Sequence, residues 1–222
     1  MKNITIENLY IKGFPSVHPG DKAAFALQLM EEYEIRDIPV SDEQTCLGLV
    51  RKNDLLDLDS QSLIKTIEDE FVPISISPEA HFTAALKLFH EFDLSVIPVK
   101  DPSSILLGVI KIENLLKSIY EFLGVEIPGA IIVIQIEKNQ FSLGELSRLI
   151  EMNNAFITQM NTSIDTELNK LIVTIKLNRK DISVIMATLQ RYDYHVLYYF
   201  GGEYYENDLK ENFDSLMAYL NI

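Results

Sequence analysis

The chain has 222 residues and a formal net charge of −14, because 33 acidic side chains stand against 19 basic ones. This charge argues against a nucleic acid or an anionic membrane surface as partner, since both are bound through clustered lysine and arginine. Hydrophobic residues make up 47% of the chain, enough to build buried cores in one or two domains.

Residues 1–14 alternate polar and apolar side chains and lack the apolar centre of a signal peptide. Elsewhere, no apolar run reaches the length of a membrane span. The single cysteine, Cys46, cannot form an internal disulfide, which is typical of a reducing compartment. These features predict a cytoplasmic protein.

The first half of the chain contains one segment twice. Residues 19–40 read PGDKAAFALQLMEEYEIRDIPV, and residues 78–99 read PEAHFTAALKLFHEFDLSVIPV. A second pair of matching blocks begins at Gly48 and Gly108, one inserted residue later. A repeat of this length indicates one small structural unit used twice.

Both copies predict the same order of elements. Apolar residues at i, i+3, i+4 and i+7 predict one helix in each copy: Ala26, Leu29, Met30 and Tyr33, then Ala85, Leu88, Phe89 and Phe92. An Ile-Pro-Val strand start, a polar turn and a short glycine-containing strand follow. A closing helix is predicted to open at Asn53 and Asp54, or at Glu113 and Asn114. With short leading strands at 16–17 and 74–76, each copy has the order β-α-β-β-α.

This pattern of an amphipathic helix, IPV, and a glycine strand followed by Asp or Asn and two leucines resembles the cystathionine β-synthase (CBS) domain family. The resemblance covers about residues 14–120, and it predicts a CBS pair over 1–124 with units of about 1–60 and 61–124. It implies a regulatory, non-catalytic module that binds AMP, ADP, ATP or S-adenosylmethionine in the clefts between paired units.

Two glycines and a proline within residues 124–129 predict a domain boundary. Strands are then expected at 130–136, 155–164, 168–177 and 194–200, with helices around 143–150 and 182–189. The order βαββαβ is that of a ferredoxin-like fold. The predicted fold class is therefore mixed α and β, with two CBS units followed by this domain over 125–203.

The 125–203 segment is similar to the ACT domain family, whose members commonly pair their sheets and bind amino acids. Its turn at 137–144 contains Gly144 inside the helix pattern, so the residues leave amino-acid binding open. A CBS pair followed by an ACT-like domain is the arrangement of the acetoin-utilisation type of CBS protein.

Residues 204–222 predict an amphipathic C-terminal helix. Its apolar stripe consists of Leu209, Phe213, Leu216, Met217 and Leu220. The stripe either packs against the chain's own sheets or forms a dimer contact. Together with the habits of both families, it predicts a homodimer.

The CBS resemblance also implies ligand residues. Asp54 matches the carboxylate that holds the ribose hydroxyls, although aspartate at this place also suits a simple helix cap. Asn114 is its counterpart in the second copy, where binding should be weaker or absent. Three residues earlier, Arg51 and Lys111 either pair with phosphate or are solvated at a helix start.

Four further residues complete the candidate set. Arg36 is a second phosphate candidate, and its counterpart is Ser95. Val17 and Ile76 either flank an adenine ring or are core residues, and Ile38 joins them as a ligand candidate.

No catalytic constellation is found. The four histidines are scattered, Cys46 has no positioned base, and neither a phosphate-binding loop nor a metal-ligand spacing occurs. We therefore expect no enzyme, no metal and no required cofactor. Two functions remain: a sensor that relays adenosine-ligand occupancy through the ACT-like domain or the dimer interface to an unidentified regulated protein, or a ligand-independent dimerisation scaffold.

Overall fold

The structure is a computed structural model, and it describes residues 4–201. The chain divides into two compact units, Met1–Phe122 (unit 1) and Leu123–Ile222 (unit 2), each described here by itself. The predicted C-terminal helix at 204–222 lies outside the described residues.

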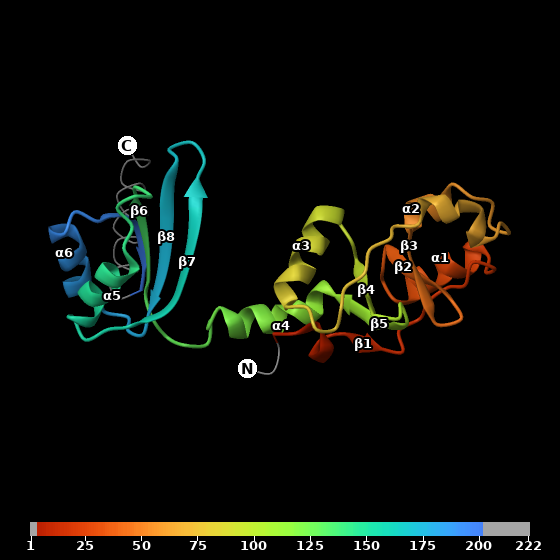
Figure 1. Ribbon diagram of the computed structural model, residues 1–222, viewed down its shortest axis with the longest axis horizontal. Helices are drawn as coiled ribbons and strands as arrows, with labels where there is room; N and C mark the ends of the chain where they lie inside the picture. The colour runs from red at the N-terminus through yellow and green to blue at the C-terminus, as the bar shows by residue number, and fades with distance from the viewer. Residues whose placement is uncertain (1–3, 202–222) are drawn as a thin grey trace, which may run out of the picture. The chain divides into compact units, whose positions relative to one another are not determined.

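Unit 1 contains the repeated segment as two copies of one fold (Figure 1). Copy one consists of α1 (Ala23–Glu32), β2 (Asp37–Asp42), β3 (Thr45–Arg51) and α2 (Lys52–Leu56), followed by the 3-10 helix η2 (Ile64–Glu70). Copy two consists of α3 (Phe82–Phe92), β4 (Val96–Lys100), β5 (Leu106–Lys111) and α4 (Ile112–Phe122). The helix-strand-strand-helix order is confirmed in both copies.

Strand pairing repeats between the copies in register. β2 pairs antiparallel with β3, and β4 pairs antiparallel with β5, with a bulge after Val40 in one copy and after Val99 in the other. The predicted leading strands are single parallel bridges, Val17 to Val40 and Ile76 to Val99. The backbone pairing is therefore equivalent in the two copies.

In each copy, the glycine of the second strand lies against the backbone of a segment that pairs with that strand. A Cβ on Gly48 would lie 2.6 Å from the Val72 carbonyl oxygen, and a Cβ on Gly108 would lie 2.1 Å from that of Ile11. The second contact belongs to β1 (Ile11–Lys12), which follows the 3-10 helix η1 (Ile6–Asn8) and pairs with β5. The first segment of the chain thus completes the sheet of copy two.

Unit 2 has the predicted ferredoxin-like order. Its elements are β6 (Ile131–Ile136), α5 (Leu143–Glu151), β7 (Ile157–Asp165), β8 (Lys170–Leu177), α6 (Ser183–Arg191) and β9 (His195–Phe200). The strands form one antiparallel sheet in the order β7-β8-β6-β9, with both helices on the same face (Figure 1).

One strand differs from its prediction. The nearly continuous aliphatic run at 130–136 is typical of a buried strand, but the side chains of β6 alternate between buried and half-buried. Ile132 and Ile134 are buried under the helices, whereas Ile131 and Val133 on the opposite face are half-buried. The helices cover only one face of this sheet, so aliphatic side chains on the other face keep some solvent contact.

Tyr194, just before β9, donates a hydrogen bond from its hydroxyl to Glu145 Oε2 on α5 at 3.1 Å. Burial, followed by this hydrogen bond to a carboxylate, raises the pKa of Tyr194 to about 12 from an ordinary value of 10.0. The folded state therefore favours the protonated phenol.

We expect this preference to produce a loss of stability in alkali. Because the pKa is raised on folding, the contribution is complete below about pH 10 and is lost as the pH rises towards about 12. Tyr194→Phe should remove this part of the pH dependence, and a difference titration at about 295 nm, where the phenolate absorbs, should show that the variant lacks one late-titrating tyrosine. Identical titration curves for both proteins would contradict the assignment.

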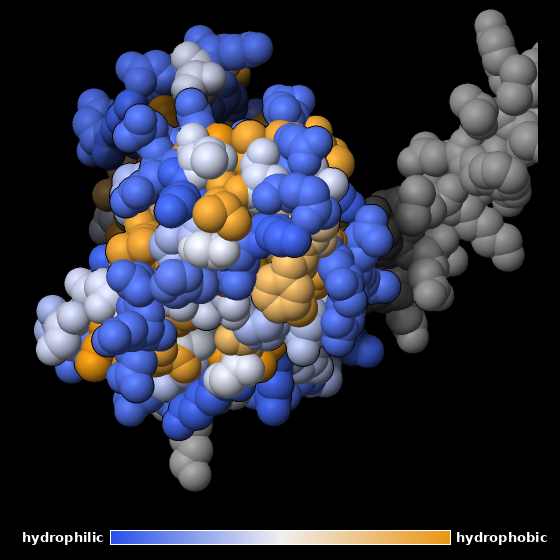
Figure 2. All heavy atoms as spheres, turned by 90° about the vertical axis from the view of Figure 1, so that its right-hand side faces the viewer, coloured by the Kyte–Doolittle hydropathy of each residue, from blue (hydrophilic) through white to orange (hydrophobic). Residues whose placement is uncertain are grey.

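The surface of unit 1 is mixed. Figure 2 shows hydrophilic residues over much of the face that it presents, with apolar residues scattered between them. Among the described residues, no helix combines the length and the apolar character that crossing a membrane requires.

Candidate functional site

The candidate ligand residues of copy one gather where β2 and β3 meet the start of α2. The Lys52 backbone N–H donates to the Arg36 carbonyl oxygen at 2.7 Å, and Asp37 pairs with Arg51 in the ladder. Arg36, Arg51 and Asp54 are therefore close along the backbone at one end of this strand pair. Val17 and Ile38 lie in the core beneath, 1% and 0% exposed.

Asp54 does not cap α2. The helix begins at Lys52, earlier than expected, so Asp54 is its third residue, and the N-cap residue Arg51 makes no side-chain cap. Within the described part of the chain, the half-buried Asp54 carboxylate has no hydrogen-bond or ion-pair partner. Both of its oxygens remain available as acceptors.

Asn114 differs from Asp54 although it occupies the equivalent position. Its Oδ1 accepts the Lys111 backbone N–H at 3.0 Å, which caps the first turn of α4. The amide oxygen is thus already used inside the protein. The core residue of this copy that corresponds to Val17 is Ile76, which is 6% exposed.

Arg51 and Lys111 each reach into the opposite copy. Arg51 Nη2 donates to the Phe92 carbonyl oxygen at 3.2 Å, and Lys111 Nζ donates to that of Tyr33 at 2.9 Å. Tyr33 and Phe92 are equivalent in the repeat and end α1 and α3, where carbonyl groups attract cations. Both cations are half-buried, and each is hydrogen-bonded to a backbone carbonyl group of the other copy.

Arg36 makes several contacts between the copies. Its Nη1 and Nη2 each lie 3.1 Å from one carboxylate oxygen of Asp93, and Nη2 also donates to the Asp93 carbonyl oxygen at 3.2 Å. The hydrogen bonds from Arg36 hold the pKa of the Asp93 carboxyl below its usual range, and the same bonds raise the pKa of Arg36. This is a two-pronged guanidinium–carboxylate pair across the repeat.

A buried carboxylate lies beside this pair. Asp37 is 3% exposed, and its Oδ2 accepts from the Ser95 backbone N–H at 2.6 Å and from the Ser95 hydroxyl at 2.7 Å. The Ser95 oxygen in turn accepts the backbone N–H groups of Arg36 and Asp37, both at 2.9 Å. Polar groups therefore join the starts of β2 and β4.

A hollow of about 530 Å³ opens between the two copies. Arg36, Asp93, Ser95 and Lys111 line it, together with residues that follow α1, residues of α3 and the first two residues of α4. Its size suits a small-molecule ligand. Of the predicted ligand residues, it brings together Arg36 and Lys111.

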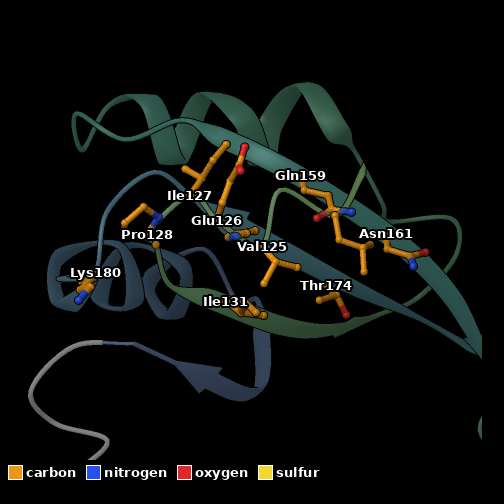
Figure 3. Close-up of a pocket in the computed structure, with 12 residues that line it drawn as sticks. Val125, Glu126, Ile127, Pro128, Ile131, Gln159, Asn161, Thr174 and Lys180 are labelled. Carbon is orange, nitrogen blue, oxygen red and sulfur yellow. The ribbon is translucent and has the colours of Figure 1, made fainter. Parts of the chain in front are cut away.

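A larger hollow of about 660 Å³ lies in unit 2 and contains none of the predicted residues (Figure 3). Val125 and Ile127 of the segment before β6 face Gln159, Asn161 and Thr174 of the sheet across it. Lys176 Nζ, which also lines it, donates to the Gly124 carbonyl oxygen. No group of three or more metal-ligating side chains is present within residues 4–201.

The sequence interpretation missed Asp93, Asp37 and the cross-copy role of Ser95. One signal was available for Asp93, since it and its repeat counterpart Glu34 are both acidic. Both adopt a left-handed backbone conformation at a helix end, with φ of 48° and 53°. An acidic residue at a helix C-terminus is unfavourable because of the helix dipole, and this favours a nearby cation as its partner.

The family comparison identifies the first copy. Residues 6–60 match the family model of the CBS domain, so the first copy is a CBS domain and the resemblance is confirmed.

Several solved structures are similar to part of the chain. A CBS domain pair/ACT domain protein from Thermotoga maritima is 28% identical, with a TM-score of 0.49, over 54% of this chain and 99% of that one. A Vibrio cholerae protein described as an acetoin utilization protein (AcuB) is 20% identical, with a TM-score of 0.46, over 56% and 96%. CBSX2 in complex with AMP is 21% identical, with a TM-score of 0.43, over 55% and 99%.

Proposed function

We propose that this chain is a non-catalytic sensor in which unit 1 binds an adenosine compound: AMP, ADP, ATP or S-adenosylmethionine. The observation that carries the proposal is the unpartnered carboxylate of Asp54, within the segment that matches the CBS domain. A carboxylate can accept hydrogen bonds from both ribose hydroxyls, and no group within residues 4–201 competes for it.

The other candidate residues have roles that follow from their places. Arg36 and Arg51 are cations near the start of α2 and would pair with phosphate, while Val17 and Ile38 would support the adenine ring from the core. Copy two offers Asn114, Lys111 and Ile76 at equivalent positions. Its site should be the weaker one, because the Asn114 oxygen is already bonded to the Lys111 backbone.

The bonds of Arg36 and Arg51 to the other copy would allow ligand binding in copy one to affect the rest of unit 1. A ligand that recruits these cations would have to weaken their bonds to Asp93 and to the Phe92 carbonyl, which belong to the other copy. The ligand can shift a conformation only through such a difference in affinity between states. We propose that the shift passes through the ACT-like unit or a homodimer interface to a regulated protein.

Calorimetric titration of the nucleotide-free chain tests the proposal. AMP, ADP, ATP, S-adenosylmethionine and a pool of amino acids should be titrated separately, with sedimentation of the same samples. Saturable binding of one adenosine compound, at about one site per chain, supports the sensor. Flat traces from a dimer would favour the alternative, a ligand-independent dimerisation scaffold.

A further inference from the structure

The guanidinium group of Arg36 is paired with an anionic group of the protein itself, the carboxylate of Asp93. Its two terminal nitrogens hold both oxygens of Asp93, in the geometry with which arginine also holds phosphate. The pair lies at the wall of the 530 Å³ hollow, with the Arg36 and Asp93 side chains 60% and 84% exposed. A dissolved anion therefore has access to both partners.

The position of Asp93 allows another anion to replace it at Arg36. It is the C-cap residue of α3 in a left-handed conformation, φ 48° and ψ 50°, where glycine or asparagine is the usual choice. Negative charge is unfavourable at a helix C-terminus, so the pair with Arg36 compensates an otherwise poor position. Exposed ion pairs of this kind contribute little net stability, and so a better anion can exchange with Asp93 at small cost.

The two copies differ at this point. The counterpart of Asp93 is Glu34, and the counterpart of Arg36 is Ser95, which is uncharged. Ser95 is instead bonded to Asp37. Of these two repeat-related positions, only that of Arg36 holds an arginine paired with a carboxylate.

We infer that Asp93 occupies the place of a ligand phosphate in the ligand-free protein, and that its displacement from Arg36 makes binding selective for phosphate-bearing over uncharged adenosine ligands. Selectivity among adenosine ligands rests on the proposed function, whereas anion binding in place of Asp93 rests on Arg36 alone. Asp93 is therefore a residue that sets specificity by competition, and it need not touch the bound ligand.

Asp93→Asn is the direct test. Asparagine tolerates the left-handed backbone and keeps the shape of the side chain, but removes the charge that competes with phosphate. We expect AMP to bind about three- to fivefold more tightly to this variant than to the parent, while adenosine binds equally to both; this is the size expected from an exposed ion pair. Arg36→Gln in the same background should abolish the gain.

Pyrophosphate provides an arm that does not depend on adenosine recognition. Titrated alone, it should bind more tightly to Asp93→Asn than to the parent, and the difference should vanish when Arg36→Gln is added. This result together with flat traces for all four adenosine compounds would reject the adenosine sensor but retain the anion site. Equal gains for AMP and adenosine, or no gain for any phosphate compound, would overturn the inference.

Discussion

Asp54→Ala is expected to raise the dissociation constant of the adenosine ligand by about 10- to 100-fold. A hydrogen bond to a charged group is worth roughly 1.5–3 kcal/mol, and the carboxylate is assigned the two ribose hydroxyls. The stability of the unliganded protein should change by less than about 0.5 kcal/mol, because the side chain makes no bond within the described residues that the substitution could remove. Calorimetry and urea unfolding on the same preparation measure both quantities.

Two variants serve as controls for this experiment. Asp57→Ala removes an exposed carboxylate just after α2 and should leave the affinity unchanged. Asp54→Asn keeps the shape of the side chain and reproduces the residue of copy two, so it should weaken binding nearly as much as alanine does. If Asp54→Ala instead costs about 1 kcal/mol of stability without changing affinity, the residue has the capping role that the structure does not show.

Gly108→Ala is expected to lower the free energy of unfolding of unit 1 by about 2–4 kcal/mol, the sum of backbone strain and lost hydrogen bonds. A Cβ at this position would lie 2.1 Å from the Ile11 carbonyl oxygen, so β1 must move away from β5. The backbone φ of 156° adds strain, and the displaced strand loses ladder hydrogen bonds worth about 1 kcal/mol each. Hydrogen exchange measured by mass spectrometry should show lost protection in β1 and β5.

Gly13→Ala is the matched control. Its φ is 65°, but a Cβ there would meet nothing within 4 Å, so the variant reports the cost of the backbone conformation alone, about 1–2 kcal/mol. Gly48→Ala, with the Val72 carbonyl oxygen 2.6 Å away, should have an intermediate effect. Equal costs at Gly13 and Gly108 would show that the close approach of β1 does not constrain copy two.

The order of elements in both units could be predicted from the sequence because it depends on local periodicity. The helix stripes, the Ile-Pro-Val strand starts and the glycine strands recur in two copies, and each copy checked the interpretation of the other. The βαββαβ order of unit 2 followed from the same local signals. The sequence did not predict which face of β6 the helices cover, because an aliphatic run has no periodicity that distinguishes the two faces of a strand.

The candidate site could be predicted only in part. Asp54 and Asn114 occupy one motif position, yet the amide caps its helix and the carboxylate does not. The sequence left the roles of Arg51 and Lys111 open because their acceptors lie 41 and 78 residues away along the chain. The pairing of Arg36 with Asp93 could not be predicted either, because these residues lie 57 positions apart along the chain.

Local sequence patterns were enough to predict that one small fold is used twice, that it resembles the CBS domain, and that a ferredoxin-like unit follows. Which of the described polar groups are already bonded, and which remain free for a ligand, depends instead on how distant parts of the chain pack together. The physical reason is that periodicity and capping act within a few residues. The partner of a charged side chain is instead set by how two copies pack, which brings Arg36 to Asp93 and leaves Asp54 without a partner among the described residues.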